Sequence, residues 1–174
     1  MTDNSIPTPP DESLLRRTMG RFTTGVAVIT TDHDGHREGM TVNSLTSVSL
    51  NPPMLLVCLA LGTRTAAAVS EGGRFGVNIL SARQEAIANR FARRGEDHFA
   101  DLPIDHGSLG IPLISHAVAH IICTVACLIE AGDHLIVLGN ILHVRYRDGL
   151  PLCFYSGTYG DFHDRGHEAE FWYF

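Results

Sequence analysis

A run of hydroxyl side chains between residues 41 and 50 is the segment of this sequence best suited to bind a polar ligand. Ser47 and Ser49 alternate with Val48 and Leu50, which is the period of a β-strand. Two interpretations stay open: a half-exposed strand, or a neutral, hydrogen-bonding edge of a ligand site. The polar side chains of the segment are Thr41, Asn43, Ser44, Thr46, Ser47 and Ser49.

A second candidate site lies where an apolar strand is expected to lead into a helix. Residues 54–61 are continuously apolar, which is typical of a strand buried on both faces. Thr63 is placed to cap a helix over 64–71, and the free amides of a helix N-terminus attract anions. Arg64 and Thr65 add side-chain donors there. This step either binds a phosphate or is an ordinary capped surface helix.

Several kinds of chemistry are excluded by the residue types present. All 13 basic residues are Arg, so Schiff-base or phosphate-loop chemistry on a lysine is ruled out. The 10 histidines are scattered; His116 and His120 are four apart, but in expected β-structure, where that is not helical ligand spacing. Without zinc-type Cys pairs, a G-x-S-x-G turn or a strand-linked G-x-G-x-x-G, we expect no metal site, serine hydrolase or Rossmann fold.

Composition indicates one globular domain. The chain has 174 residues, 44% of them hydrophobic and 18% charged, and can fold without a disulfide or metal. Its net charge of −6 argues against nucleic-acid and anionic-membrane partners. The start of the chain has acids and prolines instead of the apolar core of a signal peptide, and no apolar run reaches transmembrane length. We therefore expect a cytoplasmic protein without membrane contact.

The cysteines are expected to act as small apolar side chains. Most of Cys58, Cys123, Cys127 and Cys153 lie in apolar runs and are predicted to be buried, reduced thiols. Cys123 and Cys127 are predicted to share one face of a strand, because side chains four apart in a strand point the same way.

The pattern of elements is mainly β. A helix over 12–22 is capped by Asp11, and a second helix begins with the Ser81/Gln84 capping box and runs through Arg93. Asp34-Gly35 predicts a tight hairpin between two strands. Two long strands around the turn at 130–134 favour a barrel or a strongly coiled antiparallel sheet. The strands are expected over 26–31, 38–42, 54–61, 75–80, 113–117, 118–130, 134–147 and 151–156.

An ordered set of segments then carries a resemblance. The segments are RFTTGVAVITT (21–31), GMTVNSLTSVSLNPP (39–53), Arg64-Thr65, FGVNIL (75–80), Phe91-Ala92, Gly132-Asp133-His134 and residues 151–160. Taken together, over about residues 14–160, the chain resembles the flavin reductase-like family, the small reductase components of two-component flavin monooxygenases. The resemblance implies a split β-barrel of the FMN-binding type with flanking helices, usually a homodimer with flavin near the dimer interface.

The resemblance also implies roles for individual residues. The isoalloxazine edge and ribityl chain would meet Thr41, Val42, Asn43, Ser44, Ser47, Val48 and Ser49, and Cys58, Leu59 and Ala60 would line the ring or ribityl. Arg64 and Thr65, with Phe91, Ala92 and Arg93, would meet the phosphate. Asp133 and His134 would lie on the nicotinamide side, His134 as an orienting donor, and Tyr159 completes the set. His134 as a solvent-exposed turn residue remains the alternative.

One departure from the family concerns the phosphate. Where the family often has a basic or polar residue and a Ser, this chain has Leu61 and Gly62, so backbone N–H groups would replace two side-chain donors. The cofactor implied is FAD or FMN, with FAD preferred, and NADH is the expected co-substrate, because clustered bases are few outside Arg90–Arg94.

The function implied is an NAD(P)H:flavin oxidoreductase. Hydride would pass from nicotinamide C4 to flavin N5, and reduced flavin would be released to a partner monooxygenase. Two alternatives remain: a non-catalytic flavin-binding split-barrel protein, and an oxidase of the pyridoxamine-phosphate type. The Gly-Asp-His turn weighs against the first and the lack of Lys against the second.

Three segments divide the chain. Residues 1–10 are expected to be disordered or draped, residues 11–160 to form the flavin reductase-like domain, and residues 161–174 to be an aromatic tail that docks on its own or a neighbouring subunit.

Overall fold

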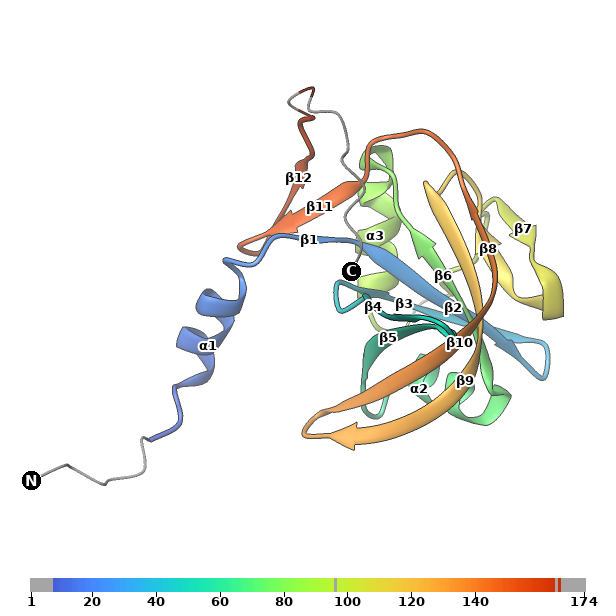
Figure 1. The fold of residues 1–174 in the computed structure, drawn as a ribbon, viewed down its shortest axis with the longest axis horizontal. Helices are drawn as coiled ribbons and strands as arrows, with labels where there is room; N and C mark the ends of the chain where they lie inside the picture. The colour runs from blue at the N-terminus through green and yellow to red at the C-terminus, as the bar shows by residue number, and fades with distance from the viewer. Residues whose placement is uncertain (1–7, 96, 165, 167–174) are drawn as a thin grey trace, which may run out of the picture.

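Seven antiparallel strands form the main sheet, hydrogen-bonded in the order β3-β2-β6-β9-β10-β5-β4 (Figure 1). The structure is a computed structural model that describes residues 8–95, 97–164 and 166. Within this part of the chain the edge strands β3 and β4 do not pair with each other, so the sheet is open. Its strands are β2 (Ala27–His33), β3 (His36–Val42), β4 (Thr46–Leu50), β5 (Pro53–Ala60), β6 (Arg74–Ile79), β9 (Ala119–Ala131) and β10 (His134–Tyr146).

Two small sheets and three α-helices complete the fold, which is mainly β as predicted. β1 (Thr24–Gly25), β11 (Leu152–Tyr155) and β12 (Thr158–Asp161) form one sheet, and β7 (Ile104–His106) and β8 (Pro112–Ile114) the other. The helices are α1 (Glu12–Met19), α2 (Arg64–Gly72) and α3 (Glu85–Ala92), with short 3-10 helices η1 (Ala82–Gln84) and η2 (Ser108–Gly110). None of the helices in the described residues has the length and apolar character of a membrane span.

The core has two parts because β2 is buried on both faces. Ile29 packs with Val57, Phe75 and Val69 of α2, whereas its neighbour Val28 packs with Phe91 of α3 and with strands β8 and β11. Adjacent strand residues point to opposite faces, so α2 and α3 cover opposite sides of the sheet. This arrangement brings the N-terminus of α2 and the C-terminus of α3 to the two sides of β3.

The predicted helix starts are confirmed by their hydrogen bonds. Asp11 Oδ1 accepts from Leu14 N at 2.8 Å, and Thr63 Oγ1 accepts from Ala66 N at 3.2 Å. Gln84 Oε1 accepts from Ser81 N at 2.9 Å, with one 3-10 turn before α3 begins. The first helix ends at Met19, three residues before the predicted end at 22, and Gly20 caps it.

The prediction that strand β5 is buried on both faces is wrong. Leu55, Val57 and Leu59 are almost completely buried, whereas Leu56 and Cys58 are partly exposed. The outward face of β5 is apolar because it forms the floor of a pocket described below. The sequence alone does not distinguish an apolar pocket floor from a second core face.

The prediction that Cys123 and Cys127 share a face is also wrong. A β-bulge at Ala126 lies between Val125, which pairs with Gly139, and Cys127, which pairs with Leu138. The extra residue reverses the alternation. Cys123 is therefore buried and Cys127 exposed, and since Cys58 and Cys153 are only partly buried, the prediction that most of the cysteines are buried is wrong too.

Helix α1 stands away from the sheets and buries none of its residues (Figure 1). Its apolar side chains Leu14, Leu15 and Met19 and the following Phe22 are all exposed. The predicted docking of the C-terminal tail, and most of the predicted N-terminal disorder, fall on residues 1–7 and 167–174, outside the described residues. The three-part division of the chain stays a prediction.

Candidate functional site

A pocket of about 430 Å³ lies where β3, α2 and α3 meet, and we term it the central pocket. Three segments far apart in sequence form its walls, together with His98. They are Glu38–Thr41 of β3, Ala60 with Gly62–Thr65 at the end of β5 and the start of α2, and Phe91–Gly95 at the end of α3.

The start of α2 gives the central pocket its anion-binding character. Gly62 turns the chain with a φ of +73°, and Thr63 then caps the helix. The amides of a first helical turn have no intrahelical acceptor, and the first turn of α2 contains no acidic residue. Arg64 is the first residue of this turn, and its side chain forms an ion pair with Glu38 of β3 at 3.3 Å. These groups suit a phosphate.

A larger pocket of about 980 Å³, which we term the ring pocket, follows the central pocket along β5. Leu56 and Cys58 line the ring pocket and Ala60 lines the central one, and alternate residues of a strand share one face. The ring pocket is also lined by Asn43–Thr46, by Met19, Gly20 and Phe22–Ala27, and by Arg16, Ile79, Phe154 and Gly157. A planar apolar ring with a polar rim fits such walls.

The hydroxyl of Thr24 also indicates that the ring pocket takes a polar-edged ligand. Thr24 Oγ1 is buried at this wall and has no hydrogen-bond partner among the described residues. An unsatisfied buried hydroxyl is destabilising unless a ligand or water completes it.

Two of the predicted flavin-binding hydroxyls are already used to hold the walls together. Ser44 Oγ accepts from Cys58 N at 3.0 Å and donates to Cys58 O at 3.1 Å, which ties the loop after β3 to β5. Thr41 Oγ1 donates to Ala88 O at 2.7 Å, which ties β3 to α3. These side chains shape the two pockets rather than offering free donors to a ligand.

The Gly-Asp-His turn between β9 and β10 lies beside the end of β5. His134 pairs with Ala60 across the strands, and Asp133 O accepts from Leu61 N at 3.0 Å. His134 Nδ1 lies 2.6 Å from Asp133 Oδ1, and this hydrogen bond holds the pKa of the Asp133 carboxyl below its usual value. The carboxylate therefore orients a half-exposed imidazole, one strand away from the central pocket.

Comparisons with known proteins agree with this geometry. The model of the flavin reductase like domain matches residues 19–163. The chain belongs to the flavin reductase-like family. It is 40% identical over 157 residues to the FMN reductase (NADH) SmoA of Agrobacterium fabrum, covering 90% of each chain. It is 36% identical over 154 residues, 88% of this chain and 83% of the other, to the reductase component of a Rhodococcus opacus 4-nitrophenol monooxygenase.

Solved structures show the same likeness. The NADH:FAD oxidoreductase SgcE6 of Streptomyces globisporus, solved with NAD and FAD fragments, superposes with a TM-score of 0.87 at 35% identity, covering 94% of this chain and 99% of the other. Component B of a nitrilotriacetate monooxygenase from Mycobacterium thermoresistibile also gives 0.87, at 36% identity, covering 93% and 92%. The predicted resemblance to the family is confirmed.

Most of the family residues predicted for the site line one of the two pockets. The central pocket gathers Thr41, Ala60, Arg64, Thr65, Phe91, Ala92 and Arg93. The ring pocket gathers Asn43, Ser44 and Cys58. The two groups meet along β5 and the end of β3, so one elongated ligand could contact both.

Other predicted residues lie elsewhere in this chain. Val42 and Leu59 are buried in the core, so their side chains reach neither pocket. Ser47, Val48 and Ser49 lie on the edge strand β4, where a bulge at Val48 breaks the predicted alternation. Tyr159 lies in β12 and packs on Phe154 with ring centroids 5.4 Å apart.

Several residues that line the pockets were not among the predicted site residues, and two examples matter for the site. Met19 and Phe22–Ala27 line the ring pocket. Phe22–Ala27 belong to segment 21–31, which resembles the family, but the resemblance implies no role for these residues. His98 lines the central pocket from the loop after α3. Nothing in its sequence surroundings distinguishes it from the other histidines.

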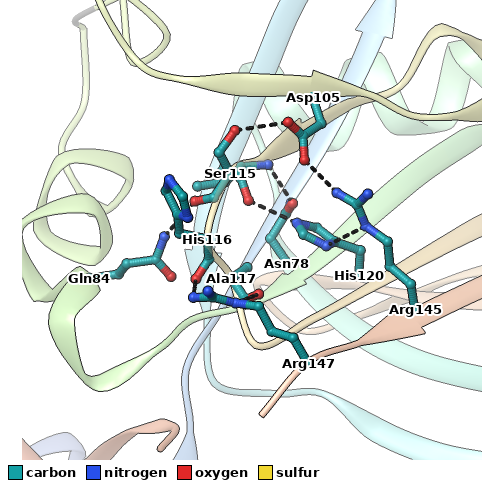
Figure 2. A network of polar contacts seen from close by, with 10 residues as sticks. Asn78, Gln84, Asp105, Ser115, His116, Ala117, His120, Arg145 and Arg147 are labelled. Atoms are coloured by element: carbon teal, nitrogen blue, oxygen red, sulfur yellow. Dashed lines mark hydrogen bonds and ion pairs between the residues drawn. The ribbon is translucent and has the colours of Figure 1, made fainter. Parts of the chain in front are cut away.

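A separate polar network lies at the far end of β9 and β10 and holds the other histidines of interest (Figure 2). Arg145 donates from Nε to His120 Nδ1 at 3.0 Å and also pairs with Asp105. His120 Nε2 lies 2.8 Å from Ile114 O, and Arg147 donates to the carbonyls of His116 and Ala117. These contacts satisfy the polar groups internally, so the network joins β7, β9 and β10 and is structural.

Proposed function

We propose that this chain catalyses the reduction of flavin by NADH and passes the reduced flavin to a partner monooxygenase in the cytoplasm. The observation that carries the proposal is the row formed by the ring pocket and the central pocket along one face of β5, with the Gly-Asp-His turn beside it. Relatives named as NADH-dependent flavin reductases and as monooxygenase reductase components support it.

The cofactors supply the redox chemistry when bound: NADH gives a hydride from C4, the flavin takes it at N5 with one proton from solvent, and NAD⁺ leaves. The chain's own residues bind and orient. In this proposal the ring pocket holds the isoalloxazine between the Asn43–Thr46 wall and the Phe22–Ala27 wall. The start of α2, with Arg64 and Thr65, holds the phosphate.

His134 acts as an orienting donor and not as a general acid. Hydride transfer needs close, aligned rings and no proton transfer from the protein in the same step. Asp133 holds the His134 ring through Nδ1, which leaves Nε2 for the nicotinamide side. This assignment rests on the turn's position next to Ala60.

A homodimeric split barrel is part of the proposal. The ring pocket is open in the single chain, and its lining includes Met19 and Phe22, two residues that are 62% and 73% exposed. Helix α1 buries none of its residues, and Leu142, Val144 and Tyr146 expose apolar surface on β10. A second copy covering these surfaces would complete the pocket, and sedimentation velocity measures the oligomeric state.

Anaerobic stopped-flow spectroscopy tests the activity. Purified protein is mixed with NADH and either FAD or FMN, and bleaching of the visible flavin absorbance is followed beside NADH absorbance. We expect one NADH oxidised per flavin, far faster than in a matched sample without protein. Stable, unbleached flavin binding would support the non-catalytic alternative instead.

Transfer of reduced flavin is tested separately. The reductase and a flavin-dependent monooxygenase are placed on opposite sides of a dialysis membrane, with NADH and flavin present. Product formation on the monooxygenase side shows that reduced flavin diffuses between the two proteins. If product forms only when both proteins share one chamber, and not across the membrane, reduced flavin is transferred by direct contact between the proteins.

A further inference from the structure

A third pocket of about 620 Å³ continues from the central pocket, and we term it the outer pocket. Its walls include Asp32, Gly35–Glu38 and Asp97–Phe99. The central and outer pockets share Glu38, Arg64 and His98 among their lining residues. The two spaces are therefore adjacent and meet at these shared side chains.

The three pockets follow one another along one stretch of chain. Residues 43–46 line the ring pocket, 38–41 the central pocket and 35–38 the outer pocket. A ligand whose ring lies in the first and whose phosphate lies in the second therefore has the third directly beyond its phosphate. FMN ends at that phosphate, whereas FAD continues through a second phosphate to adenosine.

His98 marks the junction between the central and outer pockets. The residue is only 7% exposed, and its ring packs on Phe91 with centroids 5.2 Å apart. Its Nε2 atom is buried and has no hydrogen-bond partner among the described residues. A buried imidazole nitrogen without a partner is destabilising, so its position at the junction of two pockets indicates a ligand that satisfies it.

The walls of the outer pocket are suited to a nucleotide half. Asp32 and Glu38 offer carboxylate acceptors for ribose hydroxyls or an adenine amino group. His36, Arg37 and Arg64 offer cationic or donor groups for a second phosphate, and Phe99 adds a ring. This mixture differs from the ring pocket, whose walls are largely apolar.

We propose that the outer pocket binds the adenosine-phosphate half of FAD, and that His98 is the residue that makes the chain prefer FAD to FMN. The inference rests on the proposed function and deepens it. His98 hydrogen-bonds the phosphate that FAD has and FMN lacks. Relatives named for FMN and for FAD both occur in the family, so the preference is a property of each chain.

Binding measurements test the proposal without relying on turnover. Isothermal titration with oxidised FAD and FMN is done on the wild type and on His98→Phe, which keeps an aromatic ring against Phe91. We expect FAD affinity to fall about tenfold, because a hydrogen bond to a charged group is lost, and FMN affinity to change less than about twofold. His106→Phe, on the exposed strand β7, is the matched control and should change neither.

A second variant and a second probe keep the test valid if His98→Phe does not fold. His36→Trp narrows the outer pocket from its exposed rim and should lower FAD affinity while leaving FMN affinity unchanged. AMP alone should bind the wild type and be displaced by FAD but not by FMN. Binding of AMP that FMN displaces equally would assign AMP to the central pocket and overturn the proposal.

Three further outcomes of these measurements would overturn the proposal. Equal losses for FAD and FMN in His98→Phe would assign His98 to the shared phosphate, and no loss for either flavin would remove it from binding; both overturn the proposal. In a third outcome, His98→Phe raises the KM for NADH with riboflavin as acceptor and leaves the ratio of FAD to FMN affinity unchanged. This result would assign the outer pocket to the dinucleotide and would also overturn the proposal. If every flavin is reduced at the expected rate in these cases, the proposed function stands and only this inference fails.

Discussion

The ring of Phe91 lies directly against the backbone of Gly39. A Cβ atom at residue 39 would be 2.7 Å from Phe91 Cε1, 2.9 Å from Cδ1 and 3.0 Å from Ile29 O. Phe91 is itself buried beside Phe99, so its ring has little room to move. The missing side chain at Gly39 thus lets α3 approach β3 closely enough to form one wall of the central pocket.

Gly39→Ala should destabilise the fold and loosen this wall. Overpacking of this kind typically costs about 1–3 kcal/mol, and the displaced Phe91 would shift Ala92 and Arg93 with it. We expect a lower urea midpoint and weaker FMN and FAD binding, measured by chemical denaturation and fluorescence titration.

Gly160→Ala is the matched control for Gly39→Ala. Gly160 lies in β12, and a Cβ there would have no atom within 4 Å. Its stability and flavin binding should stay close to those of the wild type. Equal effects at both glycines would mean that the loss reflects glycine replacement in a strand and not the contact with Phe91.

Local patterns predicted most of the elements. The three helix starts follow from Asp11, Thr63 and the Ser81/Gln84 pair, because capping depends on residues only three apart. The Asp34-Gly35 hairpin is confirmed for the same reason, with positive φ at both turn residues. Strand β12 was not predicted, because its four residues lack an alternating apolar pattern.

Features that depend on distant contacts could not be predicted from the sequence. The approach of Phe91 to Gly39 joins residues 52 positions apart, and the isolation of His98 Nε2 depends on what surrounds it. The bulge at Ala126 has no residue signature, so the faces of Cys123 and Cys127 were assigned wrongly. The site residues came from the family resemblance, and only the folded chain divides them between two pockets.

Arg64→Gln tests whether the start of α2 binds the flavin phosphate. Loss of a charged hydrogen bond should weaken FMN and FAD binding by about tenfold to a hundredfold, and should leave riboflavin, which has no phosphate, unchanged. Fluorescence titration at two salt concentrations measures both the loss and the weaker salt dependence.

The control for Arg64→Gln is Arg83→Gln, at an exposed position of η1 outside the three pockets. It removes the same charge from the chain and should not change flavin binding. If FMN affinity, like riboflavin affinity, is the same in Arg64→Gln as in the wild type, the start of α2 does not bind the phosphate. In that case α2 is an ordinary capped surface helix.

His134→Ala tests the Gly-Asp-His turn. Because His134 is held by Asp133 beside Ala60, its loss should raise the KM for NADH by about two- to tenfold, the value of one hydrogen bond, with little change in flavin affinity. Steady-state kinetics at saturating flavin and a separate flavin titration measure the two effects. His143→Ala, an exposed histidine on the same strand, is the control, and steady-state constants for NADH that match it would exclude His134 from the reaction.

Stability should depend on pH through His120, at the centre of the network in Figure 2. Burial lowers the pKa of His120 below its usual 6.5, and the neighbouring Arg145 cation acts in the same direction. The unfolded chain then binds a proton at a pH where the folded chain does not, so stability is complete above about pH 6.5 and falls as the pH drops through the folded-state pKa. The Asp105 carboxyl does not interfere, because its pKa is lowered from 3.8 by Arg145 and its contribution is lost only at more acidic pH.

Thermal unfolding between pH 7.5 and pH 5 measures this dependence. The unfolding temperature of the wild type should fall steadily below about pH 6.5. His120→Gln should have a lower unfolding temperature than the wild type at pH 7.5, and this temperature should change less down to pH 5, because the titrating group is gone. His143→Gln removes an exposed histidine and should keep the wild-type slope. A slope in His120→Gln as steep as that of the wild type would mean that another group, and not the imidazole beside Arg145, controls acid stability in this range.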